Sequence, residues 1–198
     1  VMHDPELGRT VAGSGHVSDY TAAQLGAMEA GAWFGPQFAG EGVPTFDAVV
    51  AYCKAQRIWM NIEIKPAPGV DVATGAAVAR ATRDYFAKEI AAGELLPLLS
   101  SFSIAALEAA RQAAPELARG WLVEAIPAEW ERTAKELGVV AIHCNHQQLT
   151  HALALAVKEA GYGLFCYTVN TPERVSELLA WGVDGFCTDR IDIIPSMA

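Results

Sequence analysis

The sequence has no run of about 18 consecutive apolar residues, the length that a membrane-spanning helix needs. Its start, Val1-Met2-His3-Asp4, has no basic segment followed by an apolar one, so no secretory signal is visible there. Basic residues are also scarce: 14 Lys and Arg stand against 23 Asp and Glu, for a formal net charge of −9. This balance argues against a nucleic acid or an anionic membrane as the main partner, but it leaves room for a local phosphate site.

Cysteine is sparse and unpaired in the sequence. The four cysteines, Cys53, Cys144, Cys166 and Cys187, form no C-x-x-C pair and stand within mostly apolar runs. We expect them to be small buried residues of a protein in a reducing compartment, and we therefore predict a cytoplasmic location. With 52% hydrophobic and 19% charged residues, the chain can bury a full core, which excludes intrinsic disorder.

Short apolar runs rich in Val, Ile and Leu alternate with helical patterns from about residue 45 onward. Ser103 stands where a helix N-cap is expected, and Thr171 precedes a proline at the first helical position. Gly161 and Gly182 each stand just past a helical stretch, at the position where a left-handed residue ends a helix. The predicted strands are Ile58–Ile64, Leu96–Ser101, Arg119–Val123, Val139–His143, Gly163–Thr168 and Asp184–Thr188.

This alternation predicts an α/β fold with parallel strands and right-handed crossovers. No Gly-rich dinucleotide turn follows a strand, so we expect a TIM-type (β/α)8 barrel rather than a Rossmann sheet. Such a barrel has eight strands and only six are predicted here, so residues 1–198 should be one barrel domain that lacks about 40–50 N-terminal residues. The two open edges argue against a well-behaved monomer and leave a homo-oligomer open.

Residues 4–44 interrupt the pattern. This segment contains eight glycines and several aromatic residues, and it favours only one short helix, around Thr21–Met28. Long irregular segments of barrel proteins tend to carry function, so we expect an insertion on the catalytic face.

The segment Asn61-Ile62-Glu63-Ile64-Lys65 carries the strongest chemical signal. Alternation along a strand places its three polar residues on one face and its two isoleucines on the other. The polar face would then point into the barrel at the strand end, where barrel enzymes place their sites. A buried Glu63–Lys65 pair with a purely structural role is the alternative, and it would be costly unless fully satisfied.

Other candidates are weaker. His3 suits general acid–base chemistry, although a histidine before an aspartate is also a common loop residue. Ser100-Ser101-Phe102 and Tyr167-Thr168-Val169-Asn170 end predicted strands, where they offer polar donors or an aromatic wall to a ligand, or cap the next helix. The spacing His143-x-Asn145-His146 matches no metal-binding helix motif and favours a rim loop held by hydrogen bonds.

Taken together, these segments resemble the glycerophosphodiester phosphodiesterase family, in order and spacing, over essentially the whole chain. Residues 141–146 and Tyr167 are similar to its bacterial cytoplasmic branch. The matching stretches include Met2-His3-Asp4-Pro5, Arg9-Thr10, Gly31-Ala32-Trp33-Phe34, Asn61-Ile62-Glu63-Ile64-Lys65-Pro66, Leu99-Ser100-Ser101-Phe102, Tyr167-Thr168-Val169-Asn170 and Trp181-Gly182-Val183-Asp184-Gly185-Phe186-Cys187-Thr188-Asp189.

The resemblance implies metal-dependent hydrolysis of a glycerophosphodiester to glycerol 3-phosphate and an alcohol, with two histidines and one divalent cation, Mg²⁺ or Ca²⁺. It also implies an orienting role for Asp4. The site residues carried over are His3 and Lys65 as catalytic groups, Glu63 as a metal ligand, and Tyr167, Trp33 and Phe34 as walls of the substrate pocket.

The sequence departs from the family in one respect. The His-Arg-Gly motif and the Glu-x-Asp pair of the first two barrel strands are absent, so we expect this chain alone to be inactive. A longer protein that retains them would be a working enzyme. Two alternatives stay open from the residues alone: a Lys65 Schiff-base lyase or aldolase, and a non-catalytic barrel that binds a phosphorylated small molecule.

Overall fold

A computed structural model describes residues 1–194 of the chain. The chain divides into two compact units. The first consists of Val1–Met60 and Lys65–Asp71, and the second consists of Asn61–Ile64 and the chain from Val72 onward.

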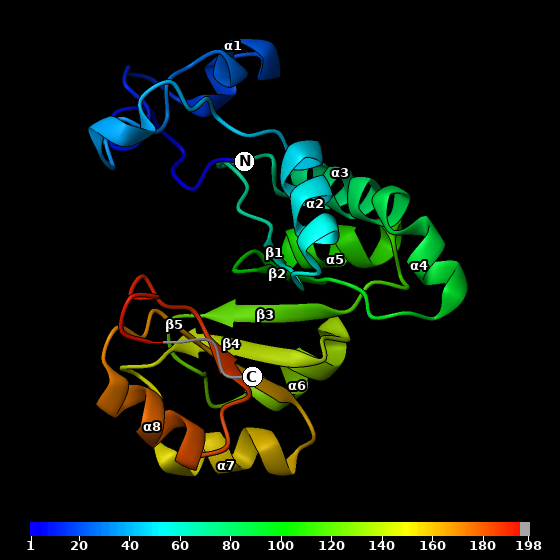
Figure 1. Ribbon diagram of the computed structural model, residues 1–198. Helices are drawn as coiled ribbons and strands as arrows, with labels where there is room; N and C mark the ends of the chain where they lie inside the picture. The colour runs from blue at the N-terminus through cyan, green and yellow to red at the C-terminus, as the bar shows by residue number, and fades with distance from the viewer. Residues whose placement is uncertain (195–198) are drawn as a thin grey trace. The chain divides into compact units, whose positions relative to one another are not determined.

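The second unit contains a six-stranded parallel sheet in which the strands follow their order in the sequence. Helices alternate with these strands, as Figure 1 shows. This arrangement confirms the expected α/β fold, with six of the eight strands of a (β/α)8 barrel. The strands are β1 (Asn61–Glu63), β2 (Leu98–Ser101), β3 (Arg119–Val123), β4 (Ala141–Asn145), β5 (Gly163–Tyr167) and β6 (Gly185–Phe186), and the helices are α3 (Asp71–Tyr85), α4 (Ala87–Ala92), α5 (Ile104–Ala113), α6 (Trp130–Leu137), α7 (His151–Glu159) and α8 (Pro172–Ala180).

The strand register separates an apolar helix-facing side of the sheet from a more polar side. Side chains of residues paired in a parallel sheet point to the same face. One face carries the core residues Leu99, Trp121, Val123, Ile142, Cys144, Leu164 and Cys166, against which helical residues pack. The other face carries Asn61, Glu63, Ser100, His143, Asn145 and Tyr167. The polar residues singled out at the ends of these strands therefore share one face.

The first unit is irregular and has a small core of its own around Leu7, Val11 and Val43. The predicted short helix is present as α1 (Ala22–Gly26), and Thr21 caps it. Two short 3₁₀ helices, η1 (Val17–Asp19) and η2 (Pro36–Phe38), and the helix α2 (Phe46–Gln56) complete the unit.

The predicted helix ends are largely confirmed. The Ser103 side chain accepts a hydrogen bond from the backbone N–H of Ala106, as an N-cap should. Gly161 and Gly182 have φ values of 83° and 88°, the left-handed conformation that ends a helix. Thr171 occupies the N-cap position before Pro172, but its side chain makes no capping hydrogen bond.

Several predicted strand boundaries are wrong, because helix ends recruit neighbouring apolar residues. The strand predicted at Ile58–Ile64 begins only at Asn61, since Ile58 bonds back to Cys53 at the end of α2. The strand predicted at Val139–His143 covers Ala141–Asn145 instead, because Val139 donates to Ala134 after the left-handed Gly138.

Two further expectations need correction. The strand predicted at Asp184–Thr188 is only Gly185–Phe186, and the Asp184 carboxylate accepts hydrogen bonds from the Lys158 ammonium and the Leu164 N–H. All four cysteines are free, but only Cys144 and Cys166 are buried; Cys53 is half-buried and Cys187 is exposed.

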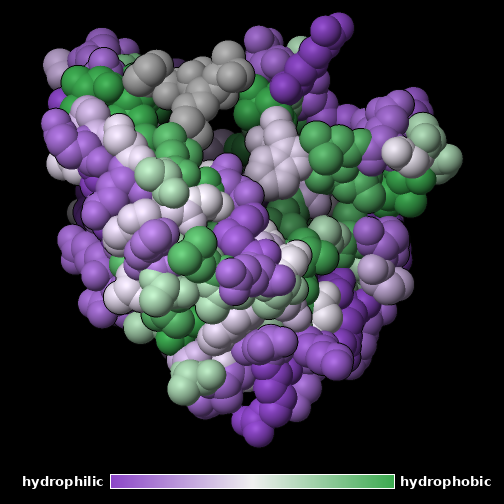
Figure 2. Space-filling model, turned by 90° about the horizontal axis from the view of Figure 1, so that it is seen from below, coloured by the Kyte–Doolittle hydropathy of each residue, from purple (hydrophilic) through white to green (hydrophobic). Residues whose placement is uncertain are grey.

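The face of the molecule that carries α7 and α8 is mostly polar, with small apolar patches scattered over it (Figure 2). No helix within residues 1–194 combines the length and the apolar character needed to cross a membrane.

His143 on β4 is a buried titratable group and gives a testable prediction. Its ring is 1% exposed and lies 4.8 Å from the Phe165 ring, and burial lowers its pKa from 6.5 to about 4. Between these two values the unfolded chain binds a proton that the folded chain excludes, so stability must fall as the pH falls from about 6.5 to about 4. The full effect is about 3 kcal/mol.

We therefore expect urea unfolding to show a steeper loss of stability between pH 7 and pH 4.5 in the parent chain than in His143→Gln. The matched control is His151→Gln, which removes an exposed histidine of α7 and should keep the parent slope. Equal slopes in the parent and in His143→Gln would contradict the prediction.

Candidate functional site

His3 lies in a continuous set of hydrogen bonds within the first unit. The Asp4 carboxylate lies 2.7 Å from His3 Nδ1, and Lys65 Nζ lies 2.9 Å from His3 Nε2. Lysine can only donate, so Nε2 is the acceptor and Nδ1 carries the proton that faces Asp4. The structure thus brings together two of the predicted site residues, His3 and Lys65, and fixes one tautomer of the imidazole.

Arg9 clamps Asp4 from the other side. Its Nε and Nη2 donate to the two carboxylate oxygens of Asp4 at 2.6 and 3.0 Å. These hydrogen bonds, followed by the one from His3, hold the pKa of Asp4 well below its usual value. Asp4 therefore stays an anion in contact with the imidazole, whereas the orienting role that the resemblance implied stays a prediction.

Trp33 and Phe34 lie in a tight loop of the same unit. Glu29 Oε1 accepts hydrogen bonds from the N–H groups of Gly31, Ala32 and Gly40, at 2.8, 2.8 and 3.3 Å. Added to Gly31, a Cβ atom would lie 2.0 Å from the Phe38 carbonyl oxygen, so only glycine fits there.

This loop leaves Trp33 and Phe34 53% and 69% exposed, with their rings 5.6 Å apart in an edge-on arrangement. The Arg9 guanidinium lies 5.8 Å from the Trp33 ring centroid. Trp33 is therefore connected to His3 through Arg9 and Asp4.

Glu63 belongs to the second unit, on the polar face of β1. It is exposed, and no side chain of residues 1–194 hydrogen-bonds to its carboxylate. The next residue, Ile64, is 1% exposed, and its backbone is tied to β2 through Ser100 O and Ser101 Oγ at 2.6 Å each. The buried isoleucine thus fixes the direction of the Glu63 side chain.

Tyr167 ends β5 on the same polar face. Its hydroxyl donates to the Val123 carbonyl at 2.8 Å and lies 3.3 Å from Glu124 Oε2. Burial first, and then the negative charges of Glu124 and Glu63, raise the pKa of Tyr167. The tyrosine is therefore a neutral donor with a fixed ring.

Glu124 is a site candidate that sequence reasoning missed. It is exposed, follows β3 directly, and accepts a hydrogen bond of 2.7 Å from Asn145 Nδ2. The signal was available, because Glu124 directly follows Arg119–Val123, a strand that was predicted with its correct bounds. The loop after β4 is held by hydrogen bonds, as expected: Asn145 Oδ1 accepts from Gln147 N at 2.9 Å.

The described residues do not complete a divalent-cation site. No group of three or more His, Cys, Asp or Glu side chains within residues 1–194 could hold a metal ion. Glu63 offers one carboxylate, whereas Mg²⁺ and Ca²⁺ take six or more oxygen ligands. These residues therefore do not fit the metal by themselves.

The Asp4 contact gives a testable prediction for the tautomer of His3. In nitrogen-15 NMR spectra of the neutral imidazole, we expect the Nδ1–H form to dominate, because Asp4 accepts from Nδ1 and Lys65 donates to Nε2. Asp4→Ala should shift the population toward the Nε2–H form. Asp47→Ala, an exposed change in the first turn of α2, serves as the control and should leave it unchanged. An unaltered tautomer ratio in Asp4→Ala would show that Asp4 does not orient the ring.

Comparisons with known proteins match this chain to one family over nearly its whole length. A profile of the family described as "Glycerophosphoryl diester phosphodiesterase family" matches residues 1–193. A glycerophosphodiester phosphodiesterase of Caldanaerobacter subterraneus subsp. tengcongensis is 30% identical over 193 residues, which cover 96% of this chain and 75% of the relative. Another, from Bacillus subtilis, is 28% identical over 207 residues, covering 98% of this chain and 69% of the relative.

One solved structure is also similar to this chain over nearly its whole length. A phosphodiesterase from Oleispira antarctica, determined in complex with the product sn-glycerol-3-phosphate, superimposes with a TM-score of 0.86 at 29% identity. The superposition covers 95% of this chain and 74% of that protein. Of the three functions that the residues left open, these matches select the phosphodiesterase.

Proposed function

Since the chain belongs to the glycerophosphoryl diester phosphodiesterase family, we propose that its hydrolysis of glycerophosphodiesters releases glycerol 3-phosphate and a free alcohol. The single observation that carries the assignment of residues is the contact between Lys65 Nζ and His3 Nε2, flanked by Asp4. The product bound to the Oleispira antarctica phosphodiesterase supports the choice of product.

We assign His3 to proton transfer. With Nδ1 facing Asp4, Nε2 is the nitrogen that can take a proton from the attacking hydroxyl once Lys65 turns to another partner. Asp4 stabilises the imidazolium that forms, and Arg9 keeps Asp4 in place. This is how an acid–base histidine is oriented in other hydrolases.

We assign Lys65 to the phosphoryl group. Its ammonium forms no ion pair with a carboxylate within residues 1–194, and it hydrogen-bonds to a neutral imidazole instead. A phosphodiester oxygen is a stronger partner for a cation than imidazole is. The incoming phosphodiester would therefore draw Lys65 from His3 and release Nε2 for proton transfer.

We propose that Glu63 supplies one ligand of a divalent cation, Mg²⁺ or Ca²⁺. Its carboxylate has no hydrogen-bond partner within residues 1–194, which leaves it available for a cation. The remaining ligands would be those of the Glu-x-Asp pair that the sequence lacks.

Trp33, Phe34 and Tyr167 are proposed to contact the substrate. The two insertion rings are exposed and held in a fixed loop, and Tyr167 presents a neutral ring and hydroxyl at a strand end. We further propose that the chain forms a single barrel domain that self-associates through the outer edges of β1 and β6. The four free cysteines support a cytoplasmic location, which we also propose.

His3 is tested in a fusion protein. In this fusion, the residues that precede the matched segment of the Caldanaerobacter relative are placed ahead of Val1. This fusion should release glycerol 3-phosphate from glycerophosphocholine, whereas the 198-residue chain alone should not. His3→Ala should lower turnover by about 10²- to 10⁴-fold, the usual contribution of a positioned acid or base. Phosphorus-31 NMR measures the product directly. An unchanged rate would remove His3 from the mechanism.

Glu63 is tested in the same fusion. Glu63→Gln keeps the size of the side chain but removes its charge, so it should abolish metal-dependent turnover while the circular dichroism spectrum stays that of the parent. Glu108→Gln, an exposed change on α5, is the matched control. If Glu63→Gln and Glu108→Gln both turn over at the parent rate, Glu63 is not a metal ligand.

A further inference from the structure

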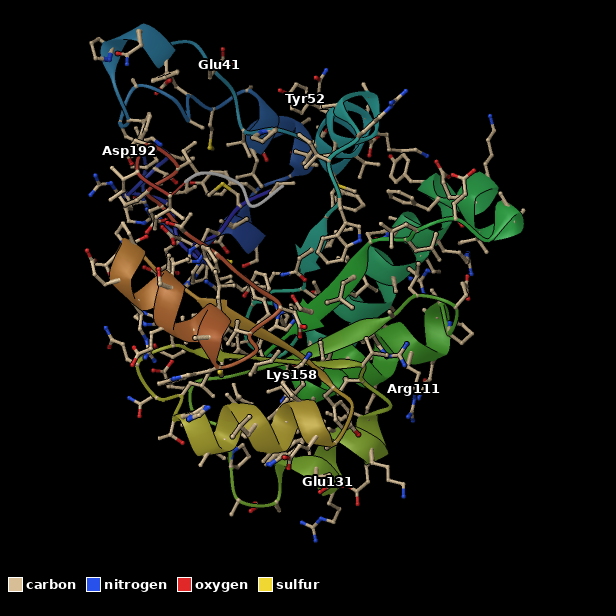
Figure 3. All side chains as sticks on the ribbon, turned by 60° about the horizontal axis from the view of Figure 1, so that its bottom comes forward. Glu41, Tyr52, Arg111, Glu131, Lys158 and Asp192 are labelled. Atoms are coloured by element: carbon tan, nitrogen blue, oxygen red, sulfur yellow. The ribbon has the colours of Figure 1, made fainter. Side chains whose placement is uncertain are left out.

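The end of the sheet where the strands begin carries two arginines. Arg119 is the first residue of β3, and Arg111 lies in the last turn of α5, the helix that returns the chain to the start of β3. Figure 1 draws β3 pointing to the left; in Figure 3, Arg111 lies on the right, and Asp192, which follows β6, lies on the left. The two arginines are thus at the opposite end of the strands from Glu63 and Tyr167, which stand at carboxyl ends.

Gly138 lies where the two guanidinium groups come together. Arg111 Nη1 donates to Glu136 O, and Arg119 Nη2 donates to Gly138 O, at 2.9 Å each. A Cβ atom added to Gly138 would lie 3.6 Å from each of these two nitrogens. Gly138 has a φ of 63°, the left-handed conformation that ends α6, and it is exposed to solvent. Both cations therefore approach one exposed position, which the glycine leaves open.

The positive charges at this position are not compensated. No Asp or Glu carboxylate within residues 1–194 forms an ion pair with Arg111 or Arg119. Arg119 is only 6% exposed, and its burial, followed by the positive charge of Arg111, lowers its pKa. A guanidinium group nevertheless stays charged at neutral pH. Two neighbouring cations, one of them buried, thus lack a counterion in a chain whose net charge is −9.

Hydrogen-bond donors are also left over. Arg119 Nε is buried and has no hydrogen-bond partner within residues 1–194. The other nitrogens of Arg119 donate to Leu117 O and Gly138 O, and Arg111 donates to Glu136 O. Since each guanidinium group has five N–H donors, most donors of the pair are unused. The carbonyl contacts explain how the two side chains are held in place, but they leave both charges and these donors available.

The chemistry of this pair fits a doubly charged oxyanion. Guanidinium groups bind phosphate and carboxylate oxygens through paired N–H donors, and such charge-assisted bonds are about twice as strong as neutral ones. A phosphate dianion can compensate both positive charges, whereas a carboxylate compensates one. A metal ion would be repelled by both groups. The pair therefore favours phosphate.

We propose that Arg111 and Arg119 form a binding site for a phosphate dianion at the end of the sheet where the strands begin. Gly138 leaves the position open, and the backbone carbonyls that accept from the two arginines hold the guanidinium groups toward it. Free phosphate and the phosphate group of a monoester share this chemistry. The site has no residue in common with the candidate functional site, so the inference does not depend on the proposed function.

The experiment follows the arginines directly, because phosphate also stabilises folded proteins without binding to a site. It starts from Lys65→Met, since Lys65 is the proposed phosphate contact of the candidate functional site. Phosphate is titrated into this chain, and nitrogen-15 NMR records the Nε–H signals of Arg111 and Arg119. We expect both signals to shift saturably with one dissociation constant, and sodium chloride at equal ionic strength to leave them in place. No saturable shift, or a shift of only one signal, would overturn the site.

A matched pair of variants locates the binding. Lys65→Met/Arg111→Met should weaken phosphate binding about tenfold or more, as read from the Arg119 signal, because it removes one charge and its donors. Lys65→Met/Arg132→Met is the control and should keep the affinity; Arg132 is an exposed residue in the first turn of α6, at the other end of that helix from Gly138. Unchanged affinity in Lys65→Met/Arg111→Met would overturn the assignment.

Two further anions define the ligand. Acetate, a monoanion, should bind at least about threefold more weakly than phosphate, and equal affinities would refute a site for a dianion. Methyl phosphate distinguishes the two sources of phosphate: affinity equal to that of phosphate supports a monoester ligand, and binding about tenfold weaker supports the free ion.

Discussion

The alternation of side chains across β1 is the constraint on which the candidate site depends. Ile62 packs against the helix-facing core, and Ile64 is fully buried in it. Hydrogen bonds from Ile64 N and to Ile64 O fix the backbone at this point to β2. A slip of one residue would bury Glu63 and expose the isoleucines, which costs both the apolar burial and the solvation of a charge. The hydrophobic core thus determines the face on which Glu63 stands, while Lys65, the next polar residue, leaves the sheet to meet His3.

The carboxylates of the two units differ in a way that matches their proposed roles. In the first unit, Asp4 is saturated by Arg9 and His3, which suits a group that orients another side chain and never leaves its place. In the second unit, Glu63 forms no ion pair with any cation of residues 1–194, although it is exposed at a strand end. A carboxylate held ready without a cationic partner is suited to bind a cation that the chain itself does not supply.

Much of the fold was predictable, because buried strands and buried helix faces appear in the sequence as apolar runs. Arg119–Val123 was predicted to the residue, and Ser103 was identified as an N-cap from its place before a helical run. The errors lie where two signals compete for one residue: Val139 is apolar enough for a strand but closes the turn after Gly138.

The site was predicted in part. Glu63, His3 and Lys65 were found from alternation and from resemblance, and the contact between His3 and Lys65 is present, whereas their joint role in catalysis stays a prediction. Glu124 contacts Asn145 and Tyr167, which are 21 and 43 positions away in the sequence, and no local pattern reports such pairings. The pairing of Arg9 with Asp4 was not predicted either.

Glu63 and Lys65, which one five-residue segment supplies, are both proposed to act on a glycerol phosphate. This proposal is tested by calorimetric titration of sn-glycerol 3-phosphate, in the presence of Mg²⁺, into the fusion that carries residues of the Caldanaerobacter relative ahead of Val1. We expect Lys65→Met and Glu63→Gln each to weaken binding by about tenfold or more, because each removes a charge that favours the bound phosphate or its cation. Glu108→Gln should bind as the parent does. Parent affinity in both Lys65→Met and Glu63→Gln would show that neither residue acts on the glycerol phosphate.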